Sequence, residues 1–228
     1  MPQRSIRAGI NNRVLSGLAP ADFALLKPHL MPIDLPVETH LETANSRIDH
    51  VYFMERGFAS VVADGLSKRS IEVGVIGREG MTGSAVVMGD DRAAHDTYIQ
   101  VAGAGQRMSA AKLRWAIDRS VRLHRSLLRC VHALLIQTTH TALANGRSKN
   151  EERLARWLLM ANDRIDGSEV PLTHKFLGIM LGVQRPAVTV AMRALEHAGL
   201  ISAGRRAITI IDRKGLERMS NGAYRPLD

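Results

Sequence analysis

Side chains suited to reading a base edge stand close together near residue 185. Gln184, Arg185 and Thr189 carry amide, guanidinium and hydroxyl groups, and a guanidinium makes two parallel hydrogen bonds to guanine. Arg205 and Arg206 follow further along the chain, and cations of this kind neutralise phosphates. These residue types predict contact with a nucleic acid. The predicted contact residues are Thr173, Gln184, Arg185, Ala187, Thr189, Arg205 and Arg206.

Two helices joined by a tight turn must position these side chains. Residues 173–181 repeat apolar side chains once per turn, which predicts a first short helix. Gly182 suits the turn because glycine adopts positive φ at little steric cost. Pro186 suits the first turn of a second helix that begins near Arg185, with Gln184 as its cap. The predicted buried side of that helix is Val188, Ala191, Met192 and Leu195.

A short hairpin is predicted directly after the second helix. Residues 201–203 and 207–211 favour strands, and the polar residues 204–206 favour the turn between them. An apolar stripe over 151–165 predicts a further helix before the pair. Three helices followed by such a hairpin make a winged helix-turn-helix, and the residues after Ser220 are expected to be loose.

The charge balance favours a polyanionic partner. The chain has 228 residues, with 31 Lys and Arg against 22 Asp and Glu and a formal net charge of +9. Such an excess favours nucleic acid, although a basic surface without a partner is the alternative. The single cysteine, Cys130, excludes an internal disulfide. The N-terminal residues lack the apolar core of a signal peptide, and no run is long enough to span a membrane, so we expect a cytoplasmic location.

The first part of the chain predicts an antiparallel β-sandwich or jelly-roll. Between about residues 33 and 108, short runs rich in Val, Ile and Tyr alternate with turn residues, a spacing typical of such folds. Two short helices are expected before these runs. The fold class is therefore α+β. The predicted strands are residues 33–35, 50–54, 59–63, 70–76 and 97–101, with one of the breaks at 55–57.

A long helix is predicted over residues 121–146. Its apolar and small polar residues recur at alternating steps of four and three, the heptad spacing of a two-helix seam. The seam predicts a homodimer, and a helix packed on its own domain is the alternative. The predicted interface residues are Leu127, Val131, Leu134, Thr138, Thr141 and Asn145. The predicted domains are residues 1–120, the helix 121–146, and residues 147–228.

A sheet domain, a dimerising helix and a winged helix-turn-helix, in that order, resemble the Crp/Fnr family of bacterial transcription regulators. The most specific part is residues 172–203, with a Leu-Thr opening, a glycine at the turn, an arginine starting the second helix, and Leu-Glu followed by Gly-Leu-Ile. The resemblance implies a homodimer on a roughly palindromic double-stranded DNA site, with RNA polymerase as a further partner. Pro186 and Val190 depart from the cyclic-AMP-binding branch, so its operator is not implied.

The same resemblance points to an effector site whose cyclic-nucleotide pattern is degenerate. Residues 80–93 correspond to the phosphate-binding cassette, and Arg92 and Ala93 fit it. Met81 replaces the glutamate that holds a ribose hydroxyl, and a thioether accepts no strong hydrogen bond. Thr138 and Thr139 fall where that branch presents two hydroxyls to the base. The candidate effector residues are Gly80, Met81, Arg92, Ala93, Thr138 and Thr139. We expect a different effector or none.

Other function classes have less support in the sequence. An iron-sulfur cluster needs several cysteines, and no spacing singles out a haem ligand among the nine histidines or a metal site. The motifs of nucleotide hydrolases, serine hydrolases and dinucleotide enzymes are absent, so an enzyme is not expected. The alternative is a small-molecule receptor that acts through protein contacts and binds little DNA. Steep loss of DNA affinity with salt would favour the regulator over this receptor.

Overall fold

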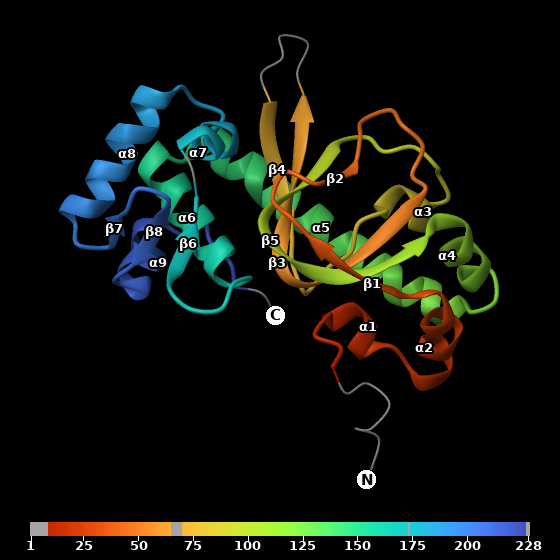
Figure 1. Cartoon of the computed structure of the whole chain (residues 1–228). Coiled ribbons are helices and arrows are strands. Elements are labelled where there is room, and N and C mark those ends of the chain that lie inside the picture. The colour runs from red at the N-terminus through yellow and green to blue at the C-terminus, as the bar shows by residue number, and fades with distance from the viewer. Residues whose placement is uncertain (1–8, 65–69, 173, 227–228) are drawn as a thin grey trace. The chain divides into compact units, whose positions relative to one another are not determined.

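The computed structural model describes residues 9–64, 70–172 and 174–226 (Figure 1). By packing, the chain divides into a first unit of residues 1–61 and 76–135 and a second unit of residues 62–75 and 136–228. The predicted α+β class is confirmed, with an antiparallel sheet, a long helix and a helix-turn-helix in chain order. The three functional domains stay a prediction, since they do not coincide with these two units.

An antiparallel sheet supplies the strands of the first unit, and its residues 62–64 and 70–75 belong to the second unit. Its strands run in the order β1-β5-β3-β4, with β2 also paired to β5. The register of β1 on β5 runs from Met31 opposite Arg107 to Leu35 opposite Gly103. The bounds are β1 Met31–Leu35, β2 His40–Glu42, β3 His50–Asp64, β4 Ser70–Ile76 and β5 Asp96–Ser109.

The strands β3 and β5 are long, and the break predicted at residues 55–57 is wrong. β3 continues through these residues, with Gly57 at φ +67°. A Cβ on Gly57 would collide with the carbonyl oxygen of Val101, and one on Gly103 would collide with that of Arg56. The two glycines therefore mark a close approach of neighbouring strands. A Glu-Arg-Gly sequence is equally typical of a turn, so the pattern alone could not separate the two.

Helices surround this sheet and share its core. Figure 1 shows α1 and α2 together, close to β1. Leu15, Phe23, Phe53, Leu113 and Leu127 are fully buried or nearly so in one hydrophobic cluster. The helices are α1 Arg13–Gly17, α2 Pro20–Leu26, the 3₁₀ turn Lys27–His29, α3 Ser84–Met88, α4 Ala110–Ile117 and α5 Val121–Arg147. The long helix predicted over 121–146 is thus observed as α5.

A buried carboxylate ties α2 to the start of α5. Asp22 accepts hydrogen bonds from Ser120 Oγ at 2.7 Å and from Arg122 Nε at 2.6 Å. Ser120 Oγ also accepts from the amide of Leu123 at 3.1 Å, which caps α5. The hydrogen bond from Arg122 is the main reason why the pKa of Asp22 lies below its ordinary value of 3.8.

Replacing Asp22 with Asn should make the stability of the chain less dependent on acid pH. A lowered folded pKa contributes stability that is complete above the ordinary pKa and is lost as pH falls through the folded pKa. We expect Asp22→Asn to lower the free energy of unfolding by about 1–2 kcal/mol near neutral pH, with a shallower decline between about pH 5 and about pH 2. Urea unfolding across this range measures both effects. The exposed Asp118→Asn is the control, and an unchanged acid dependence in Asp22→Asn would assign the decline to other carboxylates.

The second unit contains helices α6 to α9 and a small sheet, and three of these helices followed by a hairpin have the predicted winged order. The sheet is antiparallel, with strand order β6-β8-β7. Its first strand, β6, was not predicted because it has only three residues and no periodic signal. The bounds are α6 Asn150–Asn162, β6 Glu169–Pro171, α7 His174–Leu181, α8 Arg185–His197, β7 Ile201–Ala203, β8 Ala207–Ile210 and α9 Arg213–Met219.

Buried polar side chains join α6 to α5 and to β4 inside this unit. Arg156 is 7% exposed and donates to Thr141 Oγ1 at 3.0 Å and to the carbonyl of Ala223 at 3.1 Å. Trp157 Nε1 donates to Glu72 Oε1 at 2.6 Å, and Glu72 is 4% exposed. Burial lowers the pKa of Arg156 to about 10, while the charge of Glu72 acts in the opposite direction. Helix α6 is therefore held to α5, β4 and the C-terminal residues by buried hydrogen bonds.

The tail is held at Asn221, Ala223 and Tyr224, so the expectation of a loose tail after Ser220 is wrong for these residues, and residues 227–228 lie outside the described part of the chain. Arg213 Nη2 donates to Asp163 Oδ1 at 2.7 Å and to the hydroxyl of Tyr224 at 2.8 Å. The Tyr224 hydroxyl donates to Asp163 Oδ2 at 2.8 Å. Burial, with the Asp163 carboxylate beside it, raises the pKa of Tyr224 to about 12. This three-residue contact joins the tail to the end of α6.

Candidate nucleic-acid interface

The turn between α7 and α8 has the predicted geometry. Gly182 has φ +59°, and its amide donates to the carbonyl of Ile179 at 3.1 Å. The amide of Val183 donates to the carbonyl of Gly178 at 3.1 Å. The positive φ at position 182 would strain the backbone of any residue with a side chain. A Cβ added there would also lie only 2.8 Å from Ile71 Cδ1. Glycine is therefore needed here for both conformation and space.

Helix α8 buries the predicted side and exposes the other (Figure 1, the blue helix α8). Val188, Ala191, Met192 and Leu195 are all buried, and α8 packs against α6 and α7. Arg185, Pro186, Val190 and Arg193 are exposed. The exposed side thus begins with a guanidinium at the first turn of the helix.

The predicted contact residues of α8 differ in how accessible they are. Gln184 is the N-cap residue, but its side chain makes no capping hydrogen bond, so that part of the prediction is wrong. Ala187 and Thr189 are half-buried, and the Thr189 hydroxyl donates to the carbonyl of Arg185 at 3.1 Å. Arg185 remains the exposed cation at the helix start. The predicted contact Thr173 lies outside the described residues.

A wing carries the second pair of predicted contacts. β7 and β8 form an antiparallel hairpin, and the amide of Gly204 donates to the carbonyl of Ala207 at 2.8 Å across its tip. Arg205 and Arg206 are exposed in this turn. Glu196 on α8 accepts a hydrogen bond from the amide of Ala203 at 2.9 Å. This bond joins the wing to the C-terminal end of α8.

Arg213 does not add to the exposed positive charge of this domain, because it is engaged by acidic side chains. Arg213 pairs with Asp163 and lies 3.4 Å from Glu217 Oε1, in addition to its contact with Tyr224. Arg193, which was not predicted as a contact, is exposed on the same side of α8 as Val190. Its position eight residues after Arg185 is the signal that could have placed it there.

The predicted seam residues of α5 face their own chain, and a neighbouring apolar row is exposed. Leu127 is fully buried, and Val131 packs against the core of the first unit. Thr141 is 8% exposed and bonded to Arg156, and Leu134, Thr138 and Asn145 are half-buried. Large exposed side chains recur one or two residues after members of this set. They are Leu128 at 39%, Leu135 at 61%, Ile136 at 44% and Leu143 at 60% exposed.

Most of the predicted effector residues of the first unit are either buried in its core or hydrogen-bonded to other residues of the same unit. Met81 is 4% exposed and packs in the cluster of Val51 and Phe53, and Ala93 is 6% exposed. Gly80 accepts a hydrogen bond from Asn12 Nδ2 at 2.8 Å. Arg92 donates to the carbonyl of Asn45 at 2.7 Å. Thr138 and Thr139 lie on α5 in the second unit. Met81 thus presents no surface to a ligand.

Glu42 is a further residue of this segment, and it was not predicted. Its carboxylate accepts from the amide of Gly83 at 2.8 Å and from Thr97 Oγ1 at 2.7 Å. Burial raises the pKa of Glu42. Gly83 belongs to the segment that resembles the phosphate-binding cassette, and the Glu42 carboxylate occupies this backbone amide of it. No local pattern links residue 42 to residue 83, which explains why sequence reasoning missed the contact.

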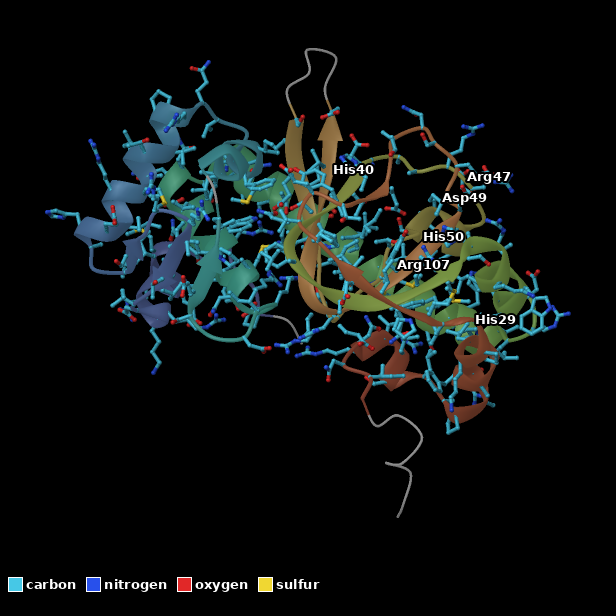
Figure 2. The ribbon with its side chains drawn as sticks, viewed as in Figure 1. His29, His40, Arg47, Asp49, His50 and Arg107 are labelled. Atoms are coloured by element: carbon cyan, nitrogen blue, oxygen red, sulfur yellow. The ribbon has the colours of Figure 1, made fainter. Side chains whose placement is uncertain are left out.

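Titratable side chains do not gather into a metal site in the described part of the chain. No group of three or more His, Cys, Asp or Glu residues there is placed to hold a metal ion. Figure 2 shows His29, His40 and His50 apart from one another. None of the helices described is long and apolar enough to cross a membrane.

The helix-turn-helix matches a family of known proteins. Residues 152–219 match the family model described as the Crp-like helix-turn-helix domain. This range contains most of α6, both helices of the motif, the wing and α9. No curated protein sequence matches the chain.

Solved structures of Crp/Fnr regulators share the fold over most of the chain. A regulator of this family from Eubacterium rectale has a TM-score of 0.73 and 16% identity, covering 92% of this chain and 98% of its own. A CRP-family regulator from Thermus thermophilus has a TM-score of 0.72 and 17% identity, covering 86% and 100%. The c-di-GMP-responsive regulator CLP from Xanthomonas campestris has a TM-score of 0.68 and 15% identity, covering 84% and 99%. At these identities the likeness shows the fold.

Proposed function

We propose that this chain is a transcription regulator of the Crp/Fnr type that reads a roughly palindromic DNA site as a homodimer, a proposal supported by the match of residues 152–219 to the Crp-like helix-turn-helix domain. The observation that carries the proposal is the exposed Arg185 at the first turn of α8, in a domain whose wing also exposes Arg205 and Arg206. In this account residues 1–120 sense, the helix 121–146 dimerises, and residues 147–228 bind DNA. RNA polymerase is the further partner through which binding would alter transcription.

The proposed docking places the first turn of α8 in the major groove. Base edges there carry a distinct pattern for each base pair, and a guanidinium reads guanine O6 and N7 together. Arg205 and Arg206 on the wing would contact phosphates, which add affinity without sequence information. Gln184, Ala187 and Thr189 flank Arg185 and complete the proposed contacts of α8, and Thr173 is proposed at the start of α7. Specificity then depends chiefly on α8.

Replacing Arg185 with Ala should relax the preference at one base position per half-site. The substitution removes the proposed contact to guanine, and we expect a loss of about 1–3 kcal/mol of binding free energy at that position. Competition among operator variants with each base at each position measures it. Arg125→Ala, an exposed arginine on α5, is the matched control. Unchanged selectivity in Arg185→Ala would reject Arg185 as a base reader.

The proposed dimer interface is the exposed apolar row of α5. Members of this family bind DNA as dimers, and a symmetric pair of helices needs apolar surface outside each chain's own core. This exposed apolar surface is provided by Leu128, Leu135, Ile136 and Leu143. Leu127 does not contribute to it, because it is buried in the core of its own chain. The proposal therefore keeps α5 as the dimerising helix and moves the contact to the neighbouring row.

We propose that the sensing domain responds to a ligand other than cyclic AMP or has lost its ligand. Met81 is buried where a ribose contact is needed, and Glu42 places a carboxylate on the Gly83 amide. A negative carboxylate at that amide disfavours a phosphate there, because like charges at short range repel. The alternative, a receptor acting through protein contacts, predicts weak DNA binding that is insensitive to salt.

Selection of DNA from a random pool tests the proposed function. The full chain is incubated with duplex containing a random segment, alone and with cyclic AMP, cyclic GMP or cyclic di-GMP, the last because the Xanthomonas neighbour responds to it. The proposal predicts enrichment of a symmetric sequence with half-sites about 10 base pairs apart, with no effect of cyclic AMP. No enriched sequence under any condition would favour the receptor.

A further inference from the structure

The exposed side of α8 has an apolar side chain at its centre. Val190 is 67% exposed, which makes it one of the most exposed large hydrophobic residues among those described. It lies opposite the buried residues Val188 and Met192 along the helix. Pro186 lies one turn before Val190 and Arg193 nearly one turn after it, and both are exposed on the same side.

Packing within the chain does not account for a valine at this position. A β-branched side chain on the exposed side of a helix is less favourable than alanine or a long polar side chain. Burial of Val190 in its own domain would require a rotation of α8 that exposes Leu195, which is fully buried. Its apolar surface is therefore available to a partner that approaches this side of α8.

The charges around Val190 indicate what kind of partner this is. Arg185 and Arg193 lie on either side of it along α8, and Arg205 and Arg206 are exposed on the wing of the same domain. An apolar protein partner would have to bury these guanidinium groups, which is costly without matching acids. Duplex DNA supplies phosphates for the arginines, and in its major groove the pyrimidine C5-methyl is the apolar group.

We propose that Val190 contacts a pyrimidine C5-methyl group and so selects thymine, or 5-methylcytosine, at one position of each half-site. The inference rests on the proposed function and adds a second specificity residue to it. Valine donates and accepts no hydrogen bond, so its selectivity depends on the methyl group alone. Thr189 is a weaker candidate for the contact, because it is half-buried and its hydroxyl donates to the carbonyl of Arg185.

Removing single methyl groups from the DNA tests the contact. In the selected operator, each thymine is replaced in turn by uracil, which keeps the base-pair hydrogen bonds and lacks only the methyl. Affinity is measured for the wild type and for Val190→Ala. We expect one position per half-site where uracil weakens wild-type binding about fourfold, the effect of one methyl-sized apolar group, and where uracil has no effect on Val190→Ala. 5-Methylcytosine at that position should bind more tightly than cytosine only in the wild type.

Val121→Ala is the matched control, because Val121 is 68% exposed at the start of α5 and should retain the uracil penalty. Alanine favours helix, so circular dichroism should show Val190→Ala folded. If the operator is bound but no thymine methyl contributes, or if the penalty persists in Val190→Ala, the inference is wrong and the proposed function stands. If no DNA sequence is selected at all, both are wrong.

Discussion

Leu135→Lys should convert the dimer into a folded monomer and raise the dimer dissociation constant by roughly 10²- to 10⁴-fold. Leu135 is 61% exposed at the centre of the apolar row of α5. Burying a leucine contributes about 1.5–3 kcal/mol, and two-fold symmetry counts each loss twice. Two lysines facing each other add like-charge repulsion. Light scattering over a range of protein concentrations measures the dissociation constant.

A matched control separates the interface from a general effect of charge. Met88 is 62% exposed on α3, and Met88→Lys should remain dimeric. Circular dichroism should show both variants folded, because neither side chain is buried in its own chain. A Leu135→Lys protein that keeps the dimer mass would move the interface away from this row of α5.

Arg156→Met should lower the free energy of unfolding by about 3–5 kcal/mol, the usual cost of removing one partner from a buried ion pair. The guanidinium of Arg156 is buried near Glu72, and its hydrogen bonds to Thr141 and Ala223 hold α5 and the tail. Methionine fills similar volume but leaves Glu72 without that positive charge. Urea unfolding followed by circular dichroism measures the change.

A second substitution at the same network distinguishes charge from packing. Glu72→Gln added to Arg156→Met removes the buried charge, so the double variant should regain part of the lost stability. Arg193→Met, at an exposed arginine of α8, should change stability by less than about 0.5 kcal/mol. No recovery in the double variant would mean that lost packing and hydrogen bonds, and not the charge, cause the effect.

The helix-turn-helix could be predicted because its signals are local. The glycine at the turn, the proline in the first helical turn and the four buried residues of α8 all act within a few residues of one another, and the structure has each of them in place. The wing was predictable for the same reason. Thr173 was proposed on equally local grounds and lies outside the described residues.

The face of α5 could not be chosen from the sequence. Two rows of apolar residues run along this helix one residue apart, and both repeat at about seven residues. Heptad spacing selects the row that begins with Leu127, but that leucine is buried in the first unit. Only contacts with distant segments decide which row remains outside. Three hydrogen bonds likewise join residues far apart in sequence and could not be predicted. They link Glu42 with Gly83, Tyr224 with Asp163, and Glu72 with Trp157.

The most direct test of a dimeric, sequence-reading regulator is a titration of the full chain onto the selected duplex and onto a scrambled duplex of the same composition, at two salt concentrations. The account predicts two chains per selected duplex, affinity at least about 10³-fold above that for the scrambled duplex, and a steep fall with salt. Equal affinity for both duplexes with no dependence on salt would contradict it.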